Sequence, residues 1–484
     1  MHAQSFLRVH SRRFAVENDC APLSILYREK NTSRNKETPQ AVSTTSEYQI
    51  ESLGECQFDS PLGLPVSTGA GIAGYVSDAV RILINIEQHG EFQLSPPTLE
   101  KAGARAKIYF RPGYTKAAIV TCGGLSPGLN NVIRSLFMQL YHRYGVKNVI
   151  GLRNGYRGLN PHYGFAPMTL TPDVVERIHR IPGTVLGTSR GEEDPRVTVD
   201  TLEREGINIL FVIGGDGTLK GAHRIWLEAK QRGLKIAIVG VPKTIDNDIN
   251  FVYKTFGFDT AVEQAKEALD CAHTEARSHP NGIGLVKIMG RDSGFIAAYA
   301  ALASRDVNFA LIPEIAFELE GENGLLAYLE KRLQTRGHAL IVVAEGAGQD
   351  LIGARKAETD ASGNARYHDI GAFLQEEIKQ HFKRRNIEIS LKYIDPSYTI
   401  RSVLPNANDS IYCDNLSRYA VHAAMAGKTD LVIGQWYNVF THVPIPLATA
   451  QRKTIRPEST LWLSVLEATG QPALMHYSRK QMHS

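Results

Sequence analysis

The sequence predicts an α/β protein with two Rossmann-like lobes, each with a largely parallel sheet, around a cleft. From residue 116 onward, short apolar runs alternate with amphipathic segments of helical length. These runs are apolar throughout, which is typical of strands that are covered on both faces. A chain of 484 residues is also too long for one ordinary core, so two compact domains with extra segments are expected.

The expected strands and helices follow one another in pairs. In the first pair, strand 116–122 precedes a helix with apolar residues at helical spacing between 129 and 140. The later pairs are 207–215 with 218–233, 235–242 with 259–276, 282–290 with 293–305, 307–314 with 324–337, and 338–346 with 371–385. Sheets of this kind bind ligands at the carboxyl ends of their strands, and the polar clusters of this sequence fall there.

The domain boundaries follow from composition. Residues 1–112 are polar and rich in helix breakers, which predicts an irregular N-terminal extension. The first lobe is expected at 113–258 and the second at 259–399. Because the chain is expected to cross between the lobes, about 400–430 should complete the first and about 431–455 the second, which leaves 456–484 as a tail.

Composition excludes several classes of protein. The net charge is +4, from 54 basic and 50 acidic residues, and no basic stripe indicates nucleic-acid binding. The longest apolar runs fall short of the roughly 18 residues of a membrane helix. The five cysteines form no CxxC pair, and the histidines, including His223 and His273, form no metal-ligand pattern.

The chain ends suggest the compartment. The opening MHAQSFLRVHSRRF is basic and free of acidic residues, as in organelle transit peptides, but it lacks the apolar centre of a secretory signal. The ending RKQMHS is unlike the Ser-Lys-Leu ending of peroxisomal proteins. A cytoplasmic protein is the default expectation.

Two glycine-rich turns follow expected strands. TCGGLSPGLN follows 116–122; its paired glycines let a phosphate approach the backbone at a helix N-terminus, although a plain tight turn has the same pattern. IGGDGTLKGA follows 207–213 and places one carboxylate, Asp216, among glycines. Backbone N–H groups there can bind phosphates while the carboxylate holds Mg²⁺, and a capped turn is the alternative.

The third cluster, PKTIDND at 242–248, also follows an expected strand. Phosphoryl transfer to an alcohol needs a base near the hydroxyl and positive charge near the moving phosphoryl group. This segment supplies both within seven residues, whereas a capped turn rarely carries a lysine, a threonine and two aspartates.

Six motifs in order and approximate spacing resemble the 6-phosphofructokinases, which phosphorylate the 1-hydroxyl of fructose 6-phosphate. They are TCGGLSPGLNNVIR, GTVLGTSRG, GGDGT, PKTIDND, MGRDSG and YIDPSYTIR, and the resemblance covers about 115–445. It implies that the first lobe binds ATP and the second fructose 6-phosphate, with Mg²⁺ as the metal. It also implies an allosteric homotetramer, or a homodimer.

The resemblance assigns roles residue by residue. Asp246 is the expected general base, Thr244 is expected to hydrogen-bond the phosphoryl acceptor region, and Asp248 supports the charge arrangement. Arg291 is expected to stabilise the transition state. The expected nucleotide-binding residues are Gly123, Arg190, Gly191, Gly215, Asp216, Gly217 and Thr218, and Asp216 is the expected metal ligand. The expected sugar-binding residues are Thr244, Ile245, Asp246, Met289, Gly290, Arg291, Glu345, Tyr398 and Arg401, the last on the 6-phosphate.

The chain departs from the bacterial pattern in the sugar site. Tyr398 and Lys392 stand where many bacterial relatives have histidine and arginine, so the 6-phosphate clamp is altered. Gly282 stands where they have an arginine that reaches into the neighbouring subunit. Either Arg277 substitutes for that arginine, or binding across subunits is weakened.

Gly217 and Lys243 are the positions that resemble the family's donor-specificity pair. Pyrophosphate-dependent members usually have aspartate and lysine there, and bacterial ATP enzymes have glycine at both. Glycine at 217 leaves room for a nucleotide α-phosphate and adds no repulsion, so ATP is the expected donor, as in the similar plant and trypanosomatid enzymes. The alternatives are a pyrophosphate-dependent enzyme, a regulatory paralogue without activity, and an NAD or lipid kinase.

Overall fold

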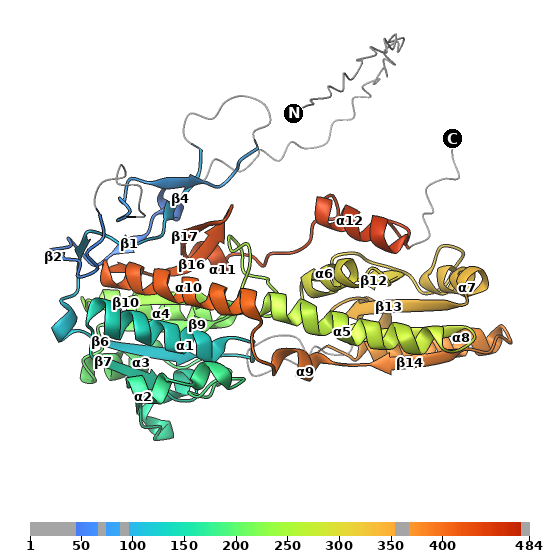
Figure 1. The fold of residues 1–484 in the computed structure, drawn as a ribbon, viewed down its shortest axis with the longest axis horizontal. Coiled ribbons are helices and arrows are strands. Elements are labelled where there is room, and N and C mark those ends of the chain that lie inside the picture. Colours follow the sequence, from blue (N-terminus) through green and yellow to red (C-terminus); the bar gives the residue numbers. More distant parts are fainter. Residues whose placement is uncertain (1–44, 66–73, 88–95, 354–366, 476–484) are drawn as a thin grey trace, which may run out of the picture. The chain divides into compact units, whose positions relative to one another are not determined.

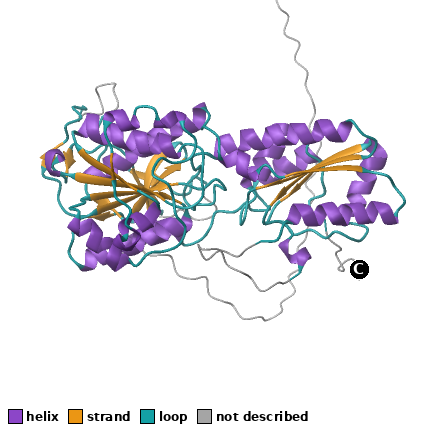
Figure 2. Ribbon diagram, turned by 90° about the horizontal axis from the view of Figure 1, so that it is seen from below, coloured by secondary structure: helices purple, strands orange, loops and turns teal. Residues whose placement is uncertain are grey.

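The computed structural model describes residues 45–65, 74–87, 96–353 and 367–475 (Figure 1). The described strands form two main sheets, and helices cover both faces of each (Figure 2). The segment compared above with a transit peptide and the last nine residues, 476–484, lie outside the described residues.

The first main sheet has nine strands, of which the central ones are parallel. In spatial order they are β3 (Arg81–Leu83), β4 (Thr98–Lys101), β17 (Val439–Pro444), β16 (Leu431–Trp436), β10 (Ala237–Pro242), β9 (Ile209–Gly214), β6 (Lys116–Thr121), β7 (Asn148–Leu152) and β8 (Met168–Thr169). Strands β16, β10, β9, β6 and β7 run parallel, and the strands at both edges are antiparallel.

Alternate residues of the central strands pack against opposite layers of helices. Ile119 of β6 contributes to the core with α1 (Leu129–Met138) and α10 (Ala407–Met425). Its neighbours Ala118 and Val120 contribute to the core with α3 (Pro195–Arg204) and α4 (Asp216–Gln231). Because both faces are buried, nearly every position of these strands must be apolar, as the sequence shows.

The second main sheet has four parallel strands in the order β12 (Phe309–Leu311), β13 (His338–Ala344), β11 (Gly282–Ile288) and β14 (Ser390–Ile394). One face packs against α5 (Phe258–Arg277), α6 (Phe295–Ser304) and α12 (Thr460–Thr469). The other packs against α7 (Leu325–Arg336) and α8 (Ile370–Arg384). The predicted fold class, α/β with largely parallel sheets, is therefore confirmed.

The short elements complete the description. They are β1 (Glu51–Ser52), β2 (Phe58–Asp59), β5 (Lys107–Ile108), β15 (Lys428–Thr429), α2 (Pro172–Val175), α9 (Ser397–Arg401), α11 (Ile445–Thr449) and the 3₁₀ turns at 45–48, 112–114, 155–159, 161–163, 178–180 and 349–352. A π-helical segment, Gln139–Tyr144, extends α1 to Gly145, whose φ of 80° ends it.

Two predicted boundaries need correction. Strands β16 and β17, at 431–444, were assigned to the second lobe, but β16 pairs with β10 of the first sheet and β17 pairs with β16. The N-terminal extension is also not wholly irregular, because β3 and β4 join the same sheet through β17. Strands β3 and β4 are short and contain polar residues, so they do not form the apolar runs by which strands are predicted from sequence.

Candidate active site

Three loops of the first sheet lie side by side because the strands before them are neighbours in register. Pro242 at the end of β10 pairs with Gly214 at the end of β9, and Ile213 pairs with Thr121 at the end of β6. The PKTIDND segment and both glycine-rich turns therefore meet at one edge of the sheet. This is the arrangement that the sequence predicted from the carboxyl ends of its strands.

A chain of hydrogen bonds holds the loop that carries Asp246. The Asp246 N–H donates to Thr244 Oγ1 (3.2 Å), and the Thr244 hydroxyl donates to Asp248 Oδ1 (2.7 Å). Between the two aspartates, Asn247 has a φ of 56°, and its side chain accepts a hydrogen bond from the Thr255 N–H (3.1 Å). Asparagine tolerates this left-handed conformation, so it can reverse the chain between two carboxylates.

The Asp246 carboxylate itself is incompletely paired. Its Oδ1 is shielded from solvent and has no hydrogen-bond partner among the described residues. Burial, together with the negative charges of Asp248 and Glu345, raises the pKa of Asp246, although a hydrogen bond from the Arg291 backbone opposes the shift. A shielded carboxylate with a raised pKa is a proton acceptor that works near neutral pH.

Lys243 lies beneath the first glycine-rich turn. Its side chain is buried, and Nζ donates to the carbonyl oxygen of Gly124 (2.6 Å). A Cβ at Gly123, whose φ is 83°, would lie 3.1 Å from this nitrogen, so the turn and the lysine fit closely. Burial lowers the pKa of Lys243 to about 8.

Two arginines lie beside the same turn. A Cβ built on Gly124 would lie 3.7 Å from Arg190 Nη2 and 3.9 Å from Arg401 Nη1. The Arg401 guanidinium also lies 4.6 Å from the ring of Tyr398, which is 75% exposed. Arg401, expected on the sugar phosphate, therefore lies close to the turn expected to bind nucleotide phosphates, and positive charge gathers there.

Asp216 is the first residue of α4, where the helix dipole favours a negative charge. Its carboxylate accepts a hydrogen bond from Lys220 Nζ (3.0 Å). At the next position, a Cβ added to Gly217 would meet no atom of the described residues within 4 Å. The glycine at 217 is therefore not required by packing, and the space beside it is open.

A small pocket adjoins Gly217. Tyr156, Gly191, Glu192 and Arg224 are among the residues that line it. The Tyr156 hydroxyl donates to the carbonyl oxygen of Thr218 (2.7 Å), and Arg224 is paired with Glu192. The expected nucleotide-binding residues thus lie on adjoining loops that border one pocket.

The MGR and VAEG segments meet at the carboxyl edge of the second sheet. Ile288 of β11 pairs with Ala344 of β13, so Met289 to Arg291 and Glu345 follow neighbouring strands, and the Glu345 N–H donates to the Ile288 carbonyl (2.9 Å). Burial raises the pKa of Glu345, whereas the positive charge of Arg291 opposes the shift. Gly290 has a φ of 127° and no room for a Cβ, which would lie 2.7 Å from the Ser293 carbonyl oxygen.

A link joins the edges of the two sheets. The Ser293 hydroxyl of the MGRDSG loop donates to the Asp246 carbonyl oxygen (3.1 Å), and Ile245 packs against the core of the second sheet. The charges of Glu345 and Asp246 also influence each other. The expected base and the expected sugar-binding residues therefore belong to one site.

The site has the kind of ligand that Mg²⁺ uses when it binds together with a nucleotide. Within the described residues, no three histidine, cysteine or acidic side chains are grouped as a metal site would require. Mg²⁺ commonly takes one or two carboxylates and completes its shell with water and substrate phosphates. Asp216, in the first turn of α4, is suited to that role.

The comparisons with known proteins agree with this geometry. A family model described as phosphofructokinase matches residues 116–424. The chain is 50% identical over 438 residues to the ATP-dependent 6-phosphofructokinase of Borreliella burgdorferi, covering 89% of this chain and 98% of the relative. The chain belongs to the phosphofructokinase family.

Further phosphofructokinases support the assignment. ATP-dependent 6-phosphofructokinase 7 of Arabidopsis thaliana is 49% identical and covers 78% of this chain and 77% of the relative; the Trypanosoma cruzi enzyme is 48% identical, with the same coverages. Among solved structures, the pyrophosphate-dependent phosphofructokinase of Marinobacter aquaeolei matches with a TM-score of 0.61 at 20% identity, covering 75% of this chain and 92% of that one. At that identity the match shows a phosphofructokinase fold.

The structure explains one departure from the bacterial phosphofructokinase pattern. Gly282 begins β11, and a Cβ there would lie 1.9 Å from the carbonyl oxygen of Ala276, so no side chain fits. Arg277 ends α5 and is exposed at the opposite end of β11 from Met289. Whether it acts across subunits stays a prediction.

Several residues around the phosphofructokinase site were missed by the sequence reasoning. Arg452 contacts Asp248 and Asp292, and Glu314 binds the N–H groups of Gly294 and Ile455. The sequence signal was the basic pair in QRKTIRP, beyond the last motif. Nothing local to that segment indicated that it folds back onto PKTIDND.

Proposed function

We propose that the protein transfers the γ-phosphoryl group of ATP to the 1-hydroxyl of fructose 6-phosphate, giving fructose 1,6-bisphosphate. The observation that carries this proposal is the buried Oδ1 of Asp246, which has no hydrogen-bond partner among the described residues; the same loop carries Lys243, which donates to the first glycine-rich turn at Gly124. Relatives from Borreliella burgdorferi, Amycolatopsis methanolica and Arabidopsis thaliana, at 46–50% identity, are called ATP-dependent 6-phosphofructokinases.

Asp246 would accept the proton of the 1-hydroxyl as the sugar oxygen forms its bond to the γ-phosphorus and ADP leaves. The raised pKa of Asp246 makes it a stronger base than an exposed aspartate. Thr244 and Asp248 would hold the loop in place through their hydrogen bond. Arg291 would stabilise the charge that develops on the phosphoryl group.

The nucleotide would lie along the two glycine-rich turns, with Gly123, Arg190, Gly191 and the segment from Gly215 to Thr218 around its phosphates and the pocket beside Gly217 next to it. Asp216 would hold Mg²⁺, which would supply positive charge that offsets the charge of the phosphates. Lys243 and Arg401 would add positive charge near the same turn. The opening beside Gly217 favours ATP over pyrophosphate as donor, because an aspartate there would repel the α-phosphate.

Glu345, Met289 and Gly290 would bind the sugar hydroxyls, and Tyr398 with Arg401 would bind the 6-phosphate. We also propose an allosteric homotetramer, or a homodimer, located in the cytoplasm. Some plant relatives are named chloroplastic, so an organelle is the alternative location. No helix among the described residues combines the length and apolarity needed to cross a bilayer.

The test is aldolase-coupled detection of fructose 1,6-bisphosphate from fructose 6-phosphate and Mg²⁺, with ATP and pyrophosphate in parallel. Turnover with ATP alone is the expected result. Turnover with pyrophosphate would assign the donor preference to Lys243 rather than Gly217, and inactivity with both donors would favour the regulatory paralogue.

A further inference from the structure

Arg452 lies among carboxylates from the loops of both main sheets. Its Nη1 donates to Asp248 Oδ2 (3.1 Å) in the PKTIDND loop and is paired with Asp292 Oδ2 in the MGRDSG loop. Although burial alone would lower it, the charges of Asp248 and Asp292, and then those of Asp216 and Asp246, raise the pKa of Arg452. One guanidinium thus pairs with two carboxylates, one from each loop, and the charges of two more act on it.

The backbone around Arg452 is fixed on both sides. Arg452 forms a β-bridge with Ile249, and the Lys453 N–H donates to the Asp248 carbonyl oxygen (2.9 Å). Three residues further on, the N–H of buried Ile455 donates to Glu314 Oε1 (2.8 Å). The backbone contacts of this segment therefore fix the position of Arg452 beside the carboxylates, which distinguishes it from a solvent-exposed arginine in a surface ion pair.

Asp248 connects Arg452 to the expected base. One oxygen of Asp248 accepts from Arg452 and the other from the Thr244 hydroxyl, which in turn accepts from the Asp246 N–H. A divalent cation that approached this group without a nucleotide would meet a positive charge already in place. Two cations within a few ångströms repel strongly in a partly buried site, so they exclude each other.

We propose that Arg452 is a resident counter-cation of this carboxylate group and competes with the free divalent metal ion for it. This inference rests on the proposed Mg²⁺-dependent phosphoryl transfer. In the nucleotide-free protein, Arg452 offsets part of the negative charge of the carboxylates and keeps Asp248 in position. Metal binding then depends on the additional ligands that nucleotide phosphates supply, which couples the entry of metal to the entry of nucleotide.

The test measures the binding of Mn²⁺ alone to the full chain without nucleotide, by electron paramagnetic resonance of the unbound ion. Arg452→Gln should bind Mn²⁺ about tenfold more tightly than the wild type, because one nearby positive charge is removed. Arg456→Gln is the matched control: it removes the same charge from an exposed position four residues along. It should bind Mn²⁺ like the wild type.

A role of Arg452 that is only structural would not increase metal affinity. Equal or weaker Mn²⁺ binding by Arg452→Gln would overturn the proposal, and so would an equal gain in Arg456→Gln. Arg452→Lys, which keeps the charge, should stay within about twofold of the wild type; an affinity equal to that of Arg452→Gln would show that charge is not the cause.

A second measurement needs no variant and stands even if Arg452→Gln does not fold. Saturating Mn²⁺ should displace Arg452 in the wild type, so amide hydrogen exchange of residues 450–455 should become faster; unchanged or slower exchange would contradict the proposal. The coupled assay of the wild type is run alongside. Inactivity there would refute the proposed function, whereas activity with unchanged Mn²⁺ binding would refute this inference alone.

Discussion

Two groups of charged residues beside the first sheet differ in how completely their buried carboxylate is paired. At the carboxyl edge, one oxygen of Asp246 has no hydrogen-bond partner within the part of the chain that the structure describes, and the pKa of Asp246 is raised. At the antiparallel edge, Glu100 of β4 accepts from Arg105 (2.8 Å) and interacts with His442 (2.9 Å). Both carboxylates belong to the same sheet, yet one is available for chemistry and the other is not.

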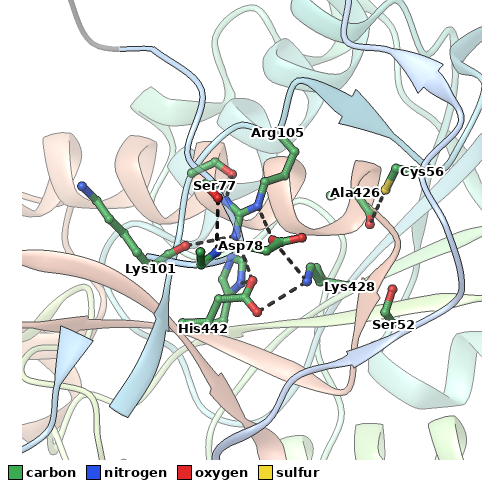
Figure 3. A network of polar contacts seen from close by, with 12 residues as sticks. Ser52, Cys56, Ser77, Asp78, Lys101, Arg105, Ala426, Lys428 and His442 are labelled. Carbon is green, nitrogen blue, oxygen red and sulfur yellow. Dashed lines mark hydrogen bonds and ion pairs between the residues drawn. The ribbon is translucent and has the colours of Figure 1, made fainter. Parts of the chain in front are cut away.

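The second group forms a network that pairs both oxygens of Glu100 and joins the N-terminal segment to β17 and β15 (Figure 3). Arg105 also donates to Asp78 (2.7 Å), and Lys428 is paired with both Asp78 (3.3 Å) and Glu100 (3.4 Å). Burial raises the pKa of Glu100, but the hydrogen bond with His442 and the charges of Lys428 and Arg105 lower it to about 2. A buried charge that is fully paired contributes to the stability of the fold, whereas an incompletely paired carboxylate can take part in a reaction.

The largest effect on activity is expected from substitution of Asp246. Asp246→Asn should lower kcat by about 10²–10⁴-fold, the usual contribution of a general base. The free energy of unfolding should stay the same or rise, because the raised pKa means that folding disfavours the charged form at neutral pH. Urea unfolding and the coupled assay measure both quantities; a folded variant with full activity would remove Asp246 from the role of base.

The open space beside Gly217 is expected to determine the use of ATP as donor. Gly217→Asp should reduce kcat/KM for ATP at least about tenfold, since about 1.4 kcal/mol of repulsion at the phosphates suffices. Stability should be retained, because the added Cβ meets no atom of the described residues within 4 Å. Gly217→Ala adds a methyl group without charge and is the control; an unaffected ATP rate in Gly217→Asp would count against the steric and electrostatic argument.

Glu100→Gln should show the opposite pattern to Asp246→Asn. Loss of the charge leaves Arg105 and Lys428 less well paired and should lower the free energy of unfolding by about 3 kcal/mol at pH 7, with kcat retained below the unfolding temperature. Since the pKa of Glu100 is depressed when folded, its contribution is complete above about pH 4.5 and is lost as the pH falls toward 2. The two proteins should therefore become equally stable in acid, and a constant difference would exclude the ion network as the cause.

The smallest effect is expected at Arg277, which lies outside both groups. Arg277→Ala should change the unfolding free energy by less than about 0.5 kcal/mol, as for most exposed positions. If Arg277 acts across subunits, the KM for fructose 6-phosphate should rise about three- to tenfold. Arg336→Ala, in the same surface hollow, is the control, and an unchanged KM in Arg277→Ala would discard the substitution hypothesis.

The sequence predicted those site residues that directly follow an apolar strand in the chain. Asp216 and Asp246 follow apolar strands, so a local pattern contained both the strand and the chemistry. Arg452 and strand β4 depend on partners hundreds of residues away, and their segments carry no apolar periodicity. The Asp246 pKa shift was also beyond reach, because it requires knowing which neighbours shield the carboxylate.

The pairing of Glu100 with His442 joins residues 342 positions apart. During synthesis, β4 leaves the ribosome long before β17 exists, so this edge of the sheet cannot form until almost the whole chain has been translated. Contacts of such high sequence separation slow folding and leave the early segment exposed in the meantime. We therefore expect the N-terminal strands to dock last, as a clasp that closes over a sheet already assembled.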